Sequence, residues 1–193
     1  MKKIAVLILN RNLPAVTDKL YNKIKKNNKD LVDIFVIDSG SLKKNISKLT
    51  TWKADWKTAK AKGLRYGRGM NFGLSQLWKE NKFKNYDAFL LLTNDTEFSN
   101  YNFISKLSKI MKKHKKIGIL SPCSKNWGEK IYLKKDKTKY FWFIHNACYL
   151  LRREFIEDIV NTKKPNFLNF LFDGANFRGY GIESELIAKA YMN

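Results

Sequence analysis

The sequence predicts an α/β fold built on a mostly parallel sheet with helices on both faces. Three short apolar runs, at residues 4–9, 34–37 and 90–92, end abruptly in polar side chains, and segments with helical periodicity lie between them. Strands that are buried on both faces are continuous apolar runs, and their alternation with helices indicates a parallel sheet. Because the carboxyl ends of such strands meet at one edge, where open α/β sheets bind ligands, we expect a single binding crevice there.

The remaining elements are predicted from periodicity and from residues that favour helix ends. Pro14 is favourable in the first turn of a helix, which we expect to reach about residue 26. Residues 42–62 are polar and fit no single pattern. The other predicted helices lie at 74–78, 103–113, 154–160 and 183–191, and the predicted strands at 32–38, 88–92, 117–120, 140–144 and 147–151.

Residues 63–73 hold four of the ten glycines of the chain. The order Gly67-Arg68-Gly69-Met70-Asn71-Phe72-Gly73 is only superficially similar to a dinucleotide fingerprint, because it does not follow the first strand. We interpret it as a glycine-rich turn that enters a helix and admits a nucleotide or sugar close to the backbone. Arg68 would supply charge there and Asn71 a polar side chain. A tight loop with a helix cap is the alternative.

Composition limits the class of protein. A chain of 193 residues with 44% hydrophobic residues is long enough for one domain with its own core. No apolar run approaches the roughly 18–20 residues that a membrane span needs, and the N-terminus lacks the features of a secretory signal. Cys123 and Cys148 have neither metal-like spacing nor the number for a disulfide framework. We therefore expect a reduced, cytoplasmic protein.

The formal net charge is +21, and lysine greatly outnumbers arginine. Three interpretations stay open: a compositional bias, attraction to an anionic membrane surface or polyanionic acceptor, and nucleic-acid binding. Specific recognition of phosphates and bases favours arginine, whose planar fork binds them in a bidentate manner. We therefore expect no nucleic-acid partner, and a location at the membrane surface stays open.

Three carboxylates follow apolar strands or open a helix. Asp38 can accept a hydrogen bond from the imide N–H of uracil or thymine, or it can cap the next turn. Asp95 suits a Mg²⁺ or Mn²⁺ ion that bridges the phosphates of a nucleoside diphosphate, or it belongs to an ordinary strand-end turn. Glu183 can deprotonate an acceptor hydroxyl as a general base. Alternatively, its negative charge stabilises the N-terminus of the helix through the helix dipole. Glu185 points to a different side of the helix.

In this order, the segments resemble family 2 glycosyltransferases of the GT-A fold. The residues that carry the resemblance are Ile4-Ala5-Val6-Leu7-Ile8-Leu9-Asn10-Arg11, Val36-Ile37-Asp38-Ser39-Gly40-Ser41, Gly67-Arg68-Gly69-Met70-Asn71-Phe72-Gly73, Leu92-Thr93-Asn94-Asp95-Thr96 and Gly181-Ile182-Glu183-Ser184-Glu185-Leu186. The resemblance implies one catalytic domain over residues 1–193 with a Rossmann-like sheet. Residues 1–97 would form the nucleotide-sugar half, and residues 98–193 a smaller, mixed acceptor lobe. The chain would be this whole domain or a fragment of something longer.

The resemblance also implies roles for single residues. Asp38 matches the acid that binds the base, Asp95 the last acid of the metal-binding Asp-x-Asp, and Glu183 the catalytic base. The nucleotide-binding set that we expect is Leu9, Asn10, Arg11, Asp38, Ser41, Arg68, Gly69, Asn71 and Asn94. The acceptor or sugar side would include Trp142, His145 and Asn146, although a structural role for the histidine and ordinary packing for the tryptophan are the alternatives.

The chain departs from the family pattern at two positions and at its end. Thr93 replaces the first acid of Asp-x-Asp, as in rhamnosyltransferase-like members, and Ser184 stands where many relatives have a second acid. The later metal-binding histidine of the family has no counterpart, because the chain ends first. These departures imply a weaker metal site.

The function implied is that of a Mn²⁺- or Mg²⁺-dependent inverting glycosyltransferase. It would move a hexose or deoxyhexose from a nucleotide-diphospho-sugar, with UDP- and dTDP-sugars favoured, to a glycan, lipid-linked or protein-linked acceptor. Two alternatives are a non-catalytic domain of the same fold that binds a nucleotide sugar or glycan, and a basic nucleic-acid-binding protein.

Overall fold

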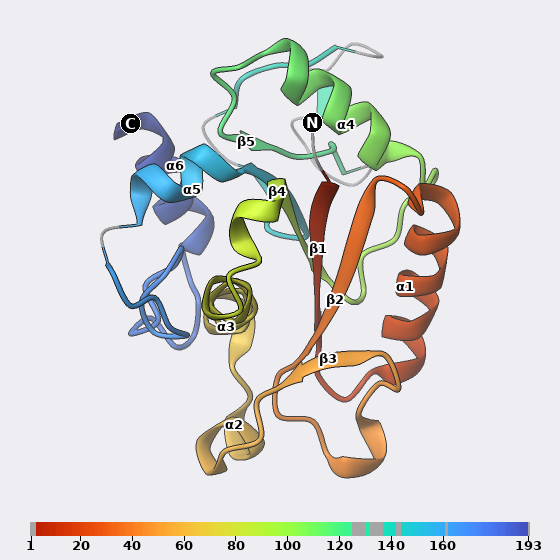
Figure 1. Ribbon diagram of the computed structural model, residues 1–193, viewed down its shortest axis with the longest axis vertical. Coiled ribbons are helices and arrows are strands. Elements are labelled where there is room, and N and C mark those ends of the chain that lie inside the picture. The colour runs from red at the N-terminus through yellow and green to blue at the C-terminus, as the bar shows by residue number, and fades with distance from the viewer. Residues whose placement is uncertain (1–2, 125–129, 132–136, 142–143, 161, 193) are drawn as a thin grey trace.

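The computed structural model describes residues 3–124, 130–131, 137–141, 144–160 and 162–192. Six strands form one sheet in the order β3-β2-β1-β4-β6-β5 (Figure 1). The strands are β1 Lys3–Asn10, β2 Val32–Asp38, β3 Thr50–Lys53, β4 Tyr86–Thr93, β5 Ile119–Leu120 and β6 Cys148–Arg152. Strands β1 to β4 pair in parallel, and β6 is antiparallel to both of its neighbours. The predicted, mostly parallel sheet is therefore confirmed.

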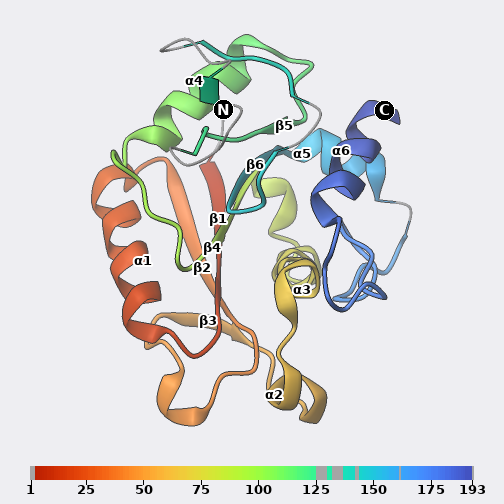
Figure 2. The same cartoon turned by 180° about the vertical axis from the view of Figure 1, so that it is seen from behind.

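Helices cover both faces of this sheet. In Figures 1 and 2, α1 Pro14–Asn28 and α4 Phe103–Lys113 lie on one side, and α3 Arg65–Lys79, α5 Arg153–Ile159 and α6 Ile182–Met192 lie on the other. The short elements are η1 Lys43–Asn45, α2 Lys57–Lys62 and η2 Phe83–Asn85. In the part of the chain that the structure describes, no helix is long and apolar enough to cross a membrane.

In the described part of the chain, the alternation of side chains along each strand produces one large hydrophobic core on each face of the sheet. In β1, Ala5 and Leu7 belong to the core under α3, α5 and α6, whereas Val6 and Ile8 belong to the core under α1 and α4. Successive side chains of a strand point to opposite faces, so a strand covered on both sides must be apolar throughout. This is the physical reason for the continuous apolar runs.

The glycine-rich segment is helical, which corrects the expectation of a turn. Helix α3 begins at Arg65, so the later glycines lie inside it, on the face toward the sheet. A Cβ at Gly69 would lie 2.5 Å from Cδ1 of Leu9, and one at Gly73 would lie 2.2 Å from Cδ1 of Ile37. These glycines therefore allow the backbone of α3 to approach the strands, and this packing outweighs their low helix propensity.

Most other elements agree with the sequence. The helices at 14–28 and 103–113 begin where they were predicted, and β2 has the predicted bounds. The strand predicted at 140–144 is wrong for its described residues Tyr140, Phe141 and Ile144, which lie outside any strand. The ambiguous region 42–62 contains the edge strand β3 between η1 and α2.

Gly40 provides a test of how closely the loop after β2 packs against α2. Its φ is +81°, and an added Cβ would lie 2.1 Å from the carbonyl oxygen of Ala59. We expect Gly40→Ala to lower the free energy of unfolding by about 2–5 kcal/mol, as the sum of left-handed strain and overpacking. Urea denaturation measures this change.

Gly181→Ala is the matched control. Gly181 has a φ of +74°, and a Cβ there would meet nothing within 4 Å, so this variant carries the strain without the clash. The two variants should therefore differ, and equal losses of stability would contradict the close contact with Ala59.

Candidate functional site

A buried polar network joins the carboxyl ends of β1, β2 and β4. Asn10 donates from Nδ2 to Oδ2 of Asp38 at 3.1 Å, and its own Oδ1 accepts from the hydroxyl of Thr17 at 2.9 Å. Asn94 donates from Nδ2 to Oγ1 of Thr17 at 3.0 Å and to Oδ1 of Asn10 at 3.3 Å. All four side chains are buried. The structure thus brings Asn10, Asp38 and Asn94 together as the sequence predicted, within a network whose hydrogen bonds are internal.

Asp38 shapes the loop that follows β2. Its Oδ1 accepts from the backbone N–H of Gly40 at 3.1 Å and of Ser41 at 2.9 Å. The Ser41 hydroxyl in turn accepts from the N–H of Asn12 at 2.9 Å. Both carboxylate oxygens of Asp38 are therefore engaged, so this structure shows the capping role, and contact with a nucleobase stays a prediction.

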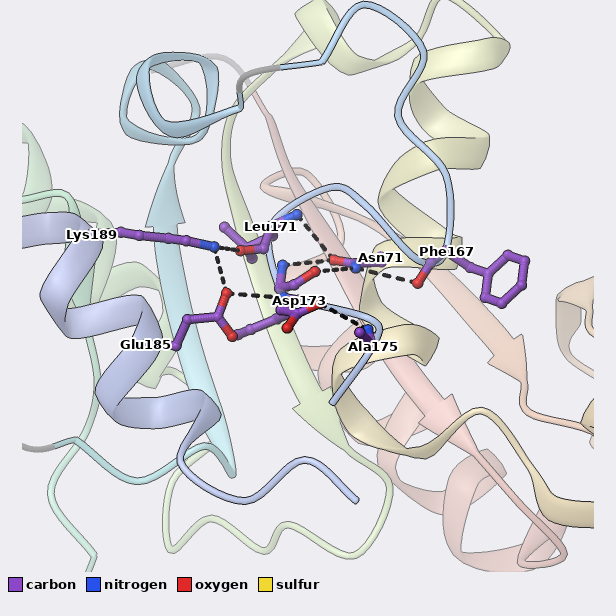
Figure 3. Close-up of polar contacts among 8 residues, drawn as sticks. Asn71, Phe167, Leu171, Asp173, Ala175, Glu185 and Lys189 are labelled. Carbon is purple, nitrogen blue, oxygen red and sulfur yellow. Dashed lines mark hydrogen bonds and ion pairs between the residues drawn. The ribbon is translucent and has the colours of Figure 1, made fainter. Parts of the chain in front are cut away.

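The Asn71 side chain holds the segment 167–172 (Figure 3). Its Oδ1 accepts from the N–H of Leu171 at 3.0 Å and of Phe172 at 2.9 Å, and its Nδ2 donates to the carbonyl of Phe172 at 2.7 Å and of Phe167 at 3.3 Å. Because its hydrogen bonds go to backbone groups about 100 residues away, Asn71 positions this segment in the structure, and its contact with a nucleotide stays a prediction.

Two arginines of the expected nucleotide set also contact other parts of the chain. Arg68 donates from Nε to the carbonyl of Gly174 at 2.5 Å, and its guanidinium lies 4.8 Å from the ring centroid of Phe177. Arg11 donates to the carbonyl of Lys62, at the end of α2. Arg68 thus links α3 to the C-terminal region, and Arg11 links the end of β1 to α2.

Helix α6 holds the same segment from the other side (Figure 3). Glu185 accepts at Oε1 from the N–H of Asp173 at 2.9 Å and from Nζ of Lys189 at 2.5 Å, and Lys189 also donates to the carbonyl of Leu171 at 2.8 Å. Sequence reasoning missed Asp173 and Lys189. The only available signal was the i, i+4 spacing of Glu185 and Lys189.

Asp95 is different from the buried network because its side chain is exposed. The turn that carries it is fixed: the hydroxyls of Thr93 and Thr96 lie 2.8 Å apart, and Thr96 donates to the carbonyl of Ala147 at 3.0 Å. Within the described residues, the Asp95 carboxylate has neither a hydrogen bond nor an ion pair. A fixed turn therefore presents a carboxylate that is available to a ligand.

A cleft of about 750 Å³ opens beside this turn. It is lined by Thr96, Glu97, Phe98, Ser99, Asn100, Phe103, Lys106, Ser121, Pro122, Cys123, Ser124, His145, Ala147 and Cys148. His145 is thus exposed on the side expected for an acceptor, and Asn146 follows it in the turn before β6. Trp142 lies outside the described residues. The acceptor roles of these residues stay predictions.

Glu183 lies half-buried in the first turn of α6, near two tyrosines that sequence reasoning missed. Burial raises the pKa of the Tyr66 hydroxyl well above its ordinary value, and the neighbouring Tyr149, Cys148 and Glu183 raise it further. Burial, followed by the charge of Glu183, also raises the pKa of Tyr149. Glu183 is therefore close enough to both hydroxyls to interact with them electrostatically.

The two tyrosine hydroxyls differ in their hydrogen bonds. Tyr149 donates to the carbonyl of Ile144 at 2.6 Å. The Tyr66 hydroxyl is buried and has no partner in the described part of the chain. A buried polar group without a hydrogen-bond partner lowers the free energy of unfolding by about 1–3 kcal/mol.

The residues present fit a divalent cation only when the substrate supplies part of its coordination. Among the described residues, no group of three or more His, Cys, Asp and Glu side chains could hold a metal ion. Mg²⁺ is commonly held by one or two carboxylates together with substrate phosphates and water. Asp95 fits that arrangement as a single protein ligand.

Comparison with known proteins shows the class of fold. No sequence-family model matches the chain, and no curated protein matches it in sequence. Among solved structures, a mannosyltransferase from Pyrobaculum calidifontis in complex with GDP-Man and Mn²⁺ is 11% identical, with a TM-score of 0.57, over 86% of this chain and 50% of that one.

Glucosyl-3-phosphoglycerate synthase from Mycobacterium tuberculosis matches in several complexes. With Mn²⁺, UDP-glucose and phosphoglyceric acid it is 15% identical, with a TM-score of 0.58, over 100% of this chain and 66% of that one. In complex with Mg²⁺ and UDP, the same enzyme is 16% identical, with a TM-score of 0.59, over 99% of this chain and 65% of that one. The chain thus spans half to two thirds of the length of these proteins.

These matches confirm the GT-A fold that the sequence resemblance implied. They do not support the narrower rhamnosyltransferase-like subgroup.

Asn71 provides a test of how the C-terminal segment is held. Asn71→Ala removes four hydrogen bonds to the backbone of residues 167–172, so we expect the free energy of unfolding to fall by about 2–4 kcal/mol. Amide hydrogen exchange of this segment should accelerate at the same time. Gln76→Ala, which truncates another amide side chain of α3, is the control, and equal effects of the two variants would contradict the positioning role.

Proposed function

We propose that this chain is the catalytic domain of a metal-dependent glycosyltransferase that moves a sugar from a nucleoside diphosphate to an acceptor hydroxyl. The observation that carries the proposal is the exposed, unpaired carboxylate of Asp95 beside a strand-end network whose other polar groups bind one another. The fold supports it, because structures of the same fold were solved with GDP-Man or UDP-glucose and Mn²⁺.

The donor would lie along the carboxyl edge of β1, β2 and β4. It would contact Leu9, Asn10, Arg11, Asp38, Ser41, Gly69 and Asn94. Asp95 would hold a Mn²⁺ or Mg²⁺ ion, which supplies positive charge to the departing diphosphate. We propose UDP- or dTDP-sugars as donors, because a carboxylate such as Asp38 accepts from the imide of a pyrimidine once one of its backbone partners is released.

Glu183 would act as the general base. Its carboxylate takes the proton of the acceptor hydroxyl while the hydroxyl oxygen bonds to the anomeric carbon. The bond from that carbon to the diphosphate oxygen breaks, and its electron pair leaves with the diphosphate. Because the attack and the departure occur on opposite faces, this single displacement inverts the anomeric centre.

Residues 147–149, which lead into β6, support this assignment because they interact with the turn that carries Asp95 and with the charge of Glu183. Ala147 accepts a hydrogen bond from the turn that carries Asp95, and Tyr149 interacts with Glu183. A sugar bound near this strand end would have the leaving group on one side and the base on the other.

We propose a glycan or lipid-linked acceptor, in the cytoplasm and at the membrane surface. The net charge of +21 supports this location, because anionic membrane surfaces attract proteins with a large positive charge. The cleft lined by His145 is the proposed acceptor side.

A non-catalytic domain that binds a nucleotide sugar is the second candidate. The observation in its favour is that Thr93 takes the place of the first acid of Asp-x-Asp, so that Asp95 is the only acid of this three-residue motif. Release of free nucleoside diphosphate from the donor distinguishes the two, because a binding domain releases none.

The role of Glu183 can be tested by substitution with glutamine. Glu183→Gln removes the base but keeps the shape, so we expect transfer to fall by about 10²–10⁴-fold while donor affinity changes little. Glu185→Gln is the charge-matched control, because its amide oxygen can still accept from Asp173. Turnover retained in Glu183→Gln would refute the assignment.

The role of Asp95 can be tested without turnover. We expect Mn²⁺ to tighten binding of UDP or dTDP by about tenfold or more in the unmodified protein, and Asp95→Asn to abolish this effect. Calorimetry should also detect little Mn²⁺ binding in the absence of nucleotide, because the protein supplies one ligand. Glu97→Gln, an exposed acid two residues away, serves as control, and an unchanged Mn²⁺ effect in Asp95→Asn would exclude the proposed site.

A further inference from the structure

A second groove, of about 610 Å³, opens between α4, β5, the end of α6 and residues 137–141. Helix α4, β5 and the end of α6 lie at the upper end of the molecule in Figures 1 and 2. The groove is lined by five exposed lysines, Lys109, Lys113, Lys116, Lys137 and Lys139. Within the described residues, none of these side chains forms a hydrogen bond or an ion pair, so their charge is available to a partner.

The positive charge is concentrated at this groove. Residues 106–116 contain six lysines and no acidic residue. Lysines in the last turn of a helix are favourable because of the helix dipole, but in α4 this accounts only for Lys112 and Lys113. Lys116 follows the helix, and Lys137 and Lys139 come from a separate segment. Helix stability therefore does not explain why these charges converge on one groove.

The backbone that carries part of this charge is held in place by Arg152 of β6. Its Nη2 donates to the carbonyl of Met111 at 2.6 Å and to that of His114 at 3.0 Å, and its Nε donates to the carbonyl of Ile117 at 2.9 Å. These carbonyls belong to the end of α4 and to the loop before β5, which carry two of the five groove lysines. The fold thus presents these lysines from a fixed backbone.

The inside of the groove is apolar. The lining includes partly or fully buried isoleucines, namely Ile110, Ile117, Ile119, Ile144 and Ile187. Two tyrosines also line it, Tyr140 with 86% and Tyr191 with 71% of its surface exposed. Tyrosine is enriched where membranes meet water, because its ring is apolar and its hydroxyl is polar. Lysines and exposed tyrosines around an apolar groove are suited to an anionic lipid surface.

The type of basic residue favours a membrane over a nucleic acid. Neither arginine nor an acidic residue is among the described residues that line the groove. Specific recognition of phosphates and bases favours the bidentate fork of arginine. Attraction to an anionic bilayer needs only positive charge near its surface, which lysine supplies.

The groove adjoins the cleft beside Asp95. Leu120 and Ile144 line the groove, and the residue that follows each of them, Ser121 and His145, lines the cleft. A bilayer bound at the groove would therefore lie next to the side that we propose for the acceptor.

We propose that this groove docks the protein on the surface of an anionic phospholipid bilayer, and that the acceptor is a lipid-linked molecule in that bilayer. The lysines attract the headgroup phosphates, and the two tyrosines enter the interface. Docking follows from the groove itself. The lipid-linked acceptor rests on the proposed function, because it requires that the neighbouring cleft bind an acceptor.

Neutralising three groove lysines tests the docking. The unmodified protein should sediment with vesicles of phosphatidylcholine and phosphatidylglycerol in equal parts, and not with vesicles of phosphatidylcholine alone. Lys109→Gln, Lys113→Gln and Lys116→Gln together should weaken binding about a hundredfold, because each lysine near an anionic surface contributes about fivefold. Added salt should also weaken the binding of the unmodified protein.

The control removes the same charge from another place. Lys57→Gln, Lys60→Gln and Lys62→Gln change three exposed lysines of α2, which lies at the opposite end of the molecule (Figure 1). Vesicle binding should fall less than about threefold in this variant, since charges farther from the surface than a Debye length are screened. Equal losses in the two triple variants would overturn the proposal.

A second variant tests the apolar part without changing the charge. Tyr140→Ser with Tyr191→Ser should weaken vesicle binding, most clearly at a salt concentration that screens the lysines. The Tm should be unchanged in this double variant and in the triple variants, because all the substituted side chains are exposed. Binding that stays unchanged in both groove variants would overturn the proposal.

Other occupants of the groove give different results. An oligonucleotide that binds more tightly than the vesicles, and loses affinity in the groove triple variant, would overturn the proposal in favour of a nucleic acid. Self-association that disappears in this variant would overturn it in favour of a second copy of the chain. Vesicle binding without sugar transfer would refute the proposed function and leave the docking intact, whereas transfer without vesicle binding would overturn the docking alone.

Discussion

The site depends on the buried amide of Asn10 at the end of β1. This one side chain donates to Asp38 after β2 and accepts from Thr17 in α1 and from Asn94 after β4. A buried amide that lost these partners would leave several polar groups unpaired, each at a cost of about 1–3 kcal/mol. The ends of three strands and one helix are therefore held in one arrangement, and the loop after β2 and the turn that presents Asp95 start from fixed points.

A second constraint, the close packing of α3 on the sheet, determines where Glu183, the proposed base, lies. Gly69 and Gly73 let the helix approach β1 and β2, and Asn71 then reaches the backbone of the C-terminal segment. Helix α6 follows this segment and holds it through Glu185. The position of Glu183 is consequently a product of tertiary contacts between distant parts of the chain, and α3 is the element that connects them to the sheet.

The sequence correctly predicted the elements whose residue patterns depend on neighbours along the chain. The core strands were readable because both of their faces are covered, and α4 because one of its faces is apolar. It failed for α3, since glycines favour turns locally while the packing against Leu9 and Ile37 decides the outcome. It gave no sign of the hydrogen bonds of Asn71, whose partners are 96–101 residues away, because no spacing along the chain encodes them. The unpaired hydroxyl of Tyr66 was equally invisible in the sequence.

The contrast between paired and unpaired groups is the most useful guide to function in this structure. Asp38 and Asn71 stand at positions that the family resemblance assigns to the nucleotide, yet the fold uses their hydrogen-bonding groups internally. Within the described residues, the Asp95 carboxylate and the Tyr66 hydroxyl have no hydrogen-bond partner; Asp95 is exposed at a strand end, and the Tyr66 hydroxyl is buried. A group that is held rigidly but left unpaired keeps its full interaction energy for a ligand or a reacting partner. By this criterion, we expect the chemistry of the site near Asp95, and the polar network of Asn10, Thr17, Asp38 and Asn94 fixes the strand end from which its turn starts.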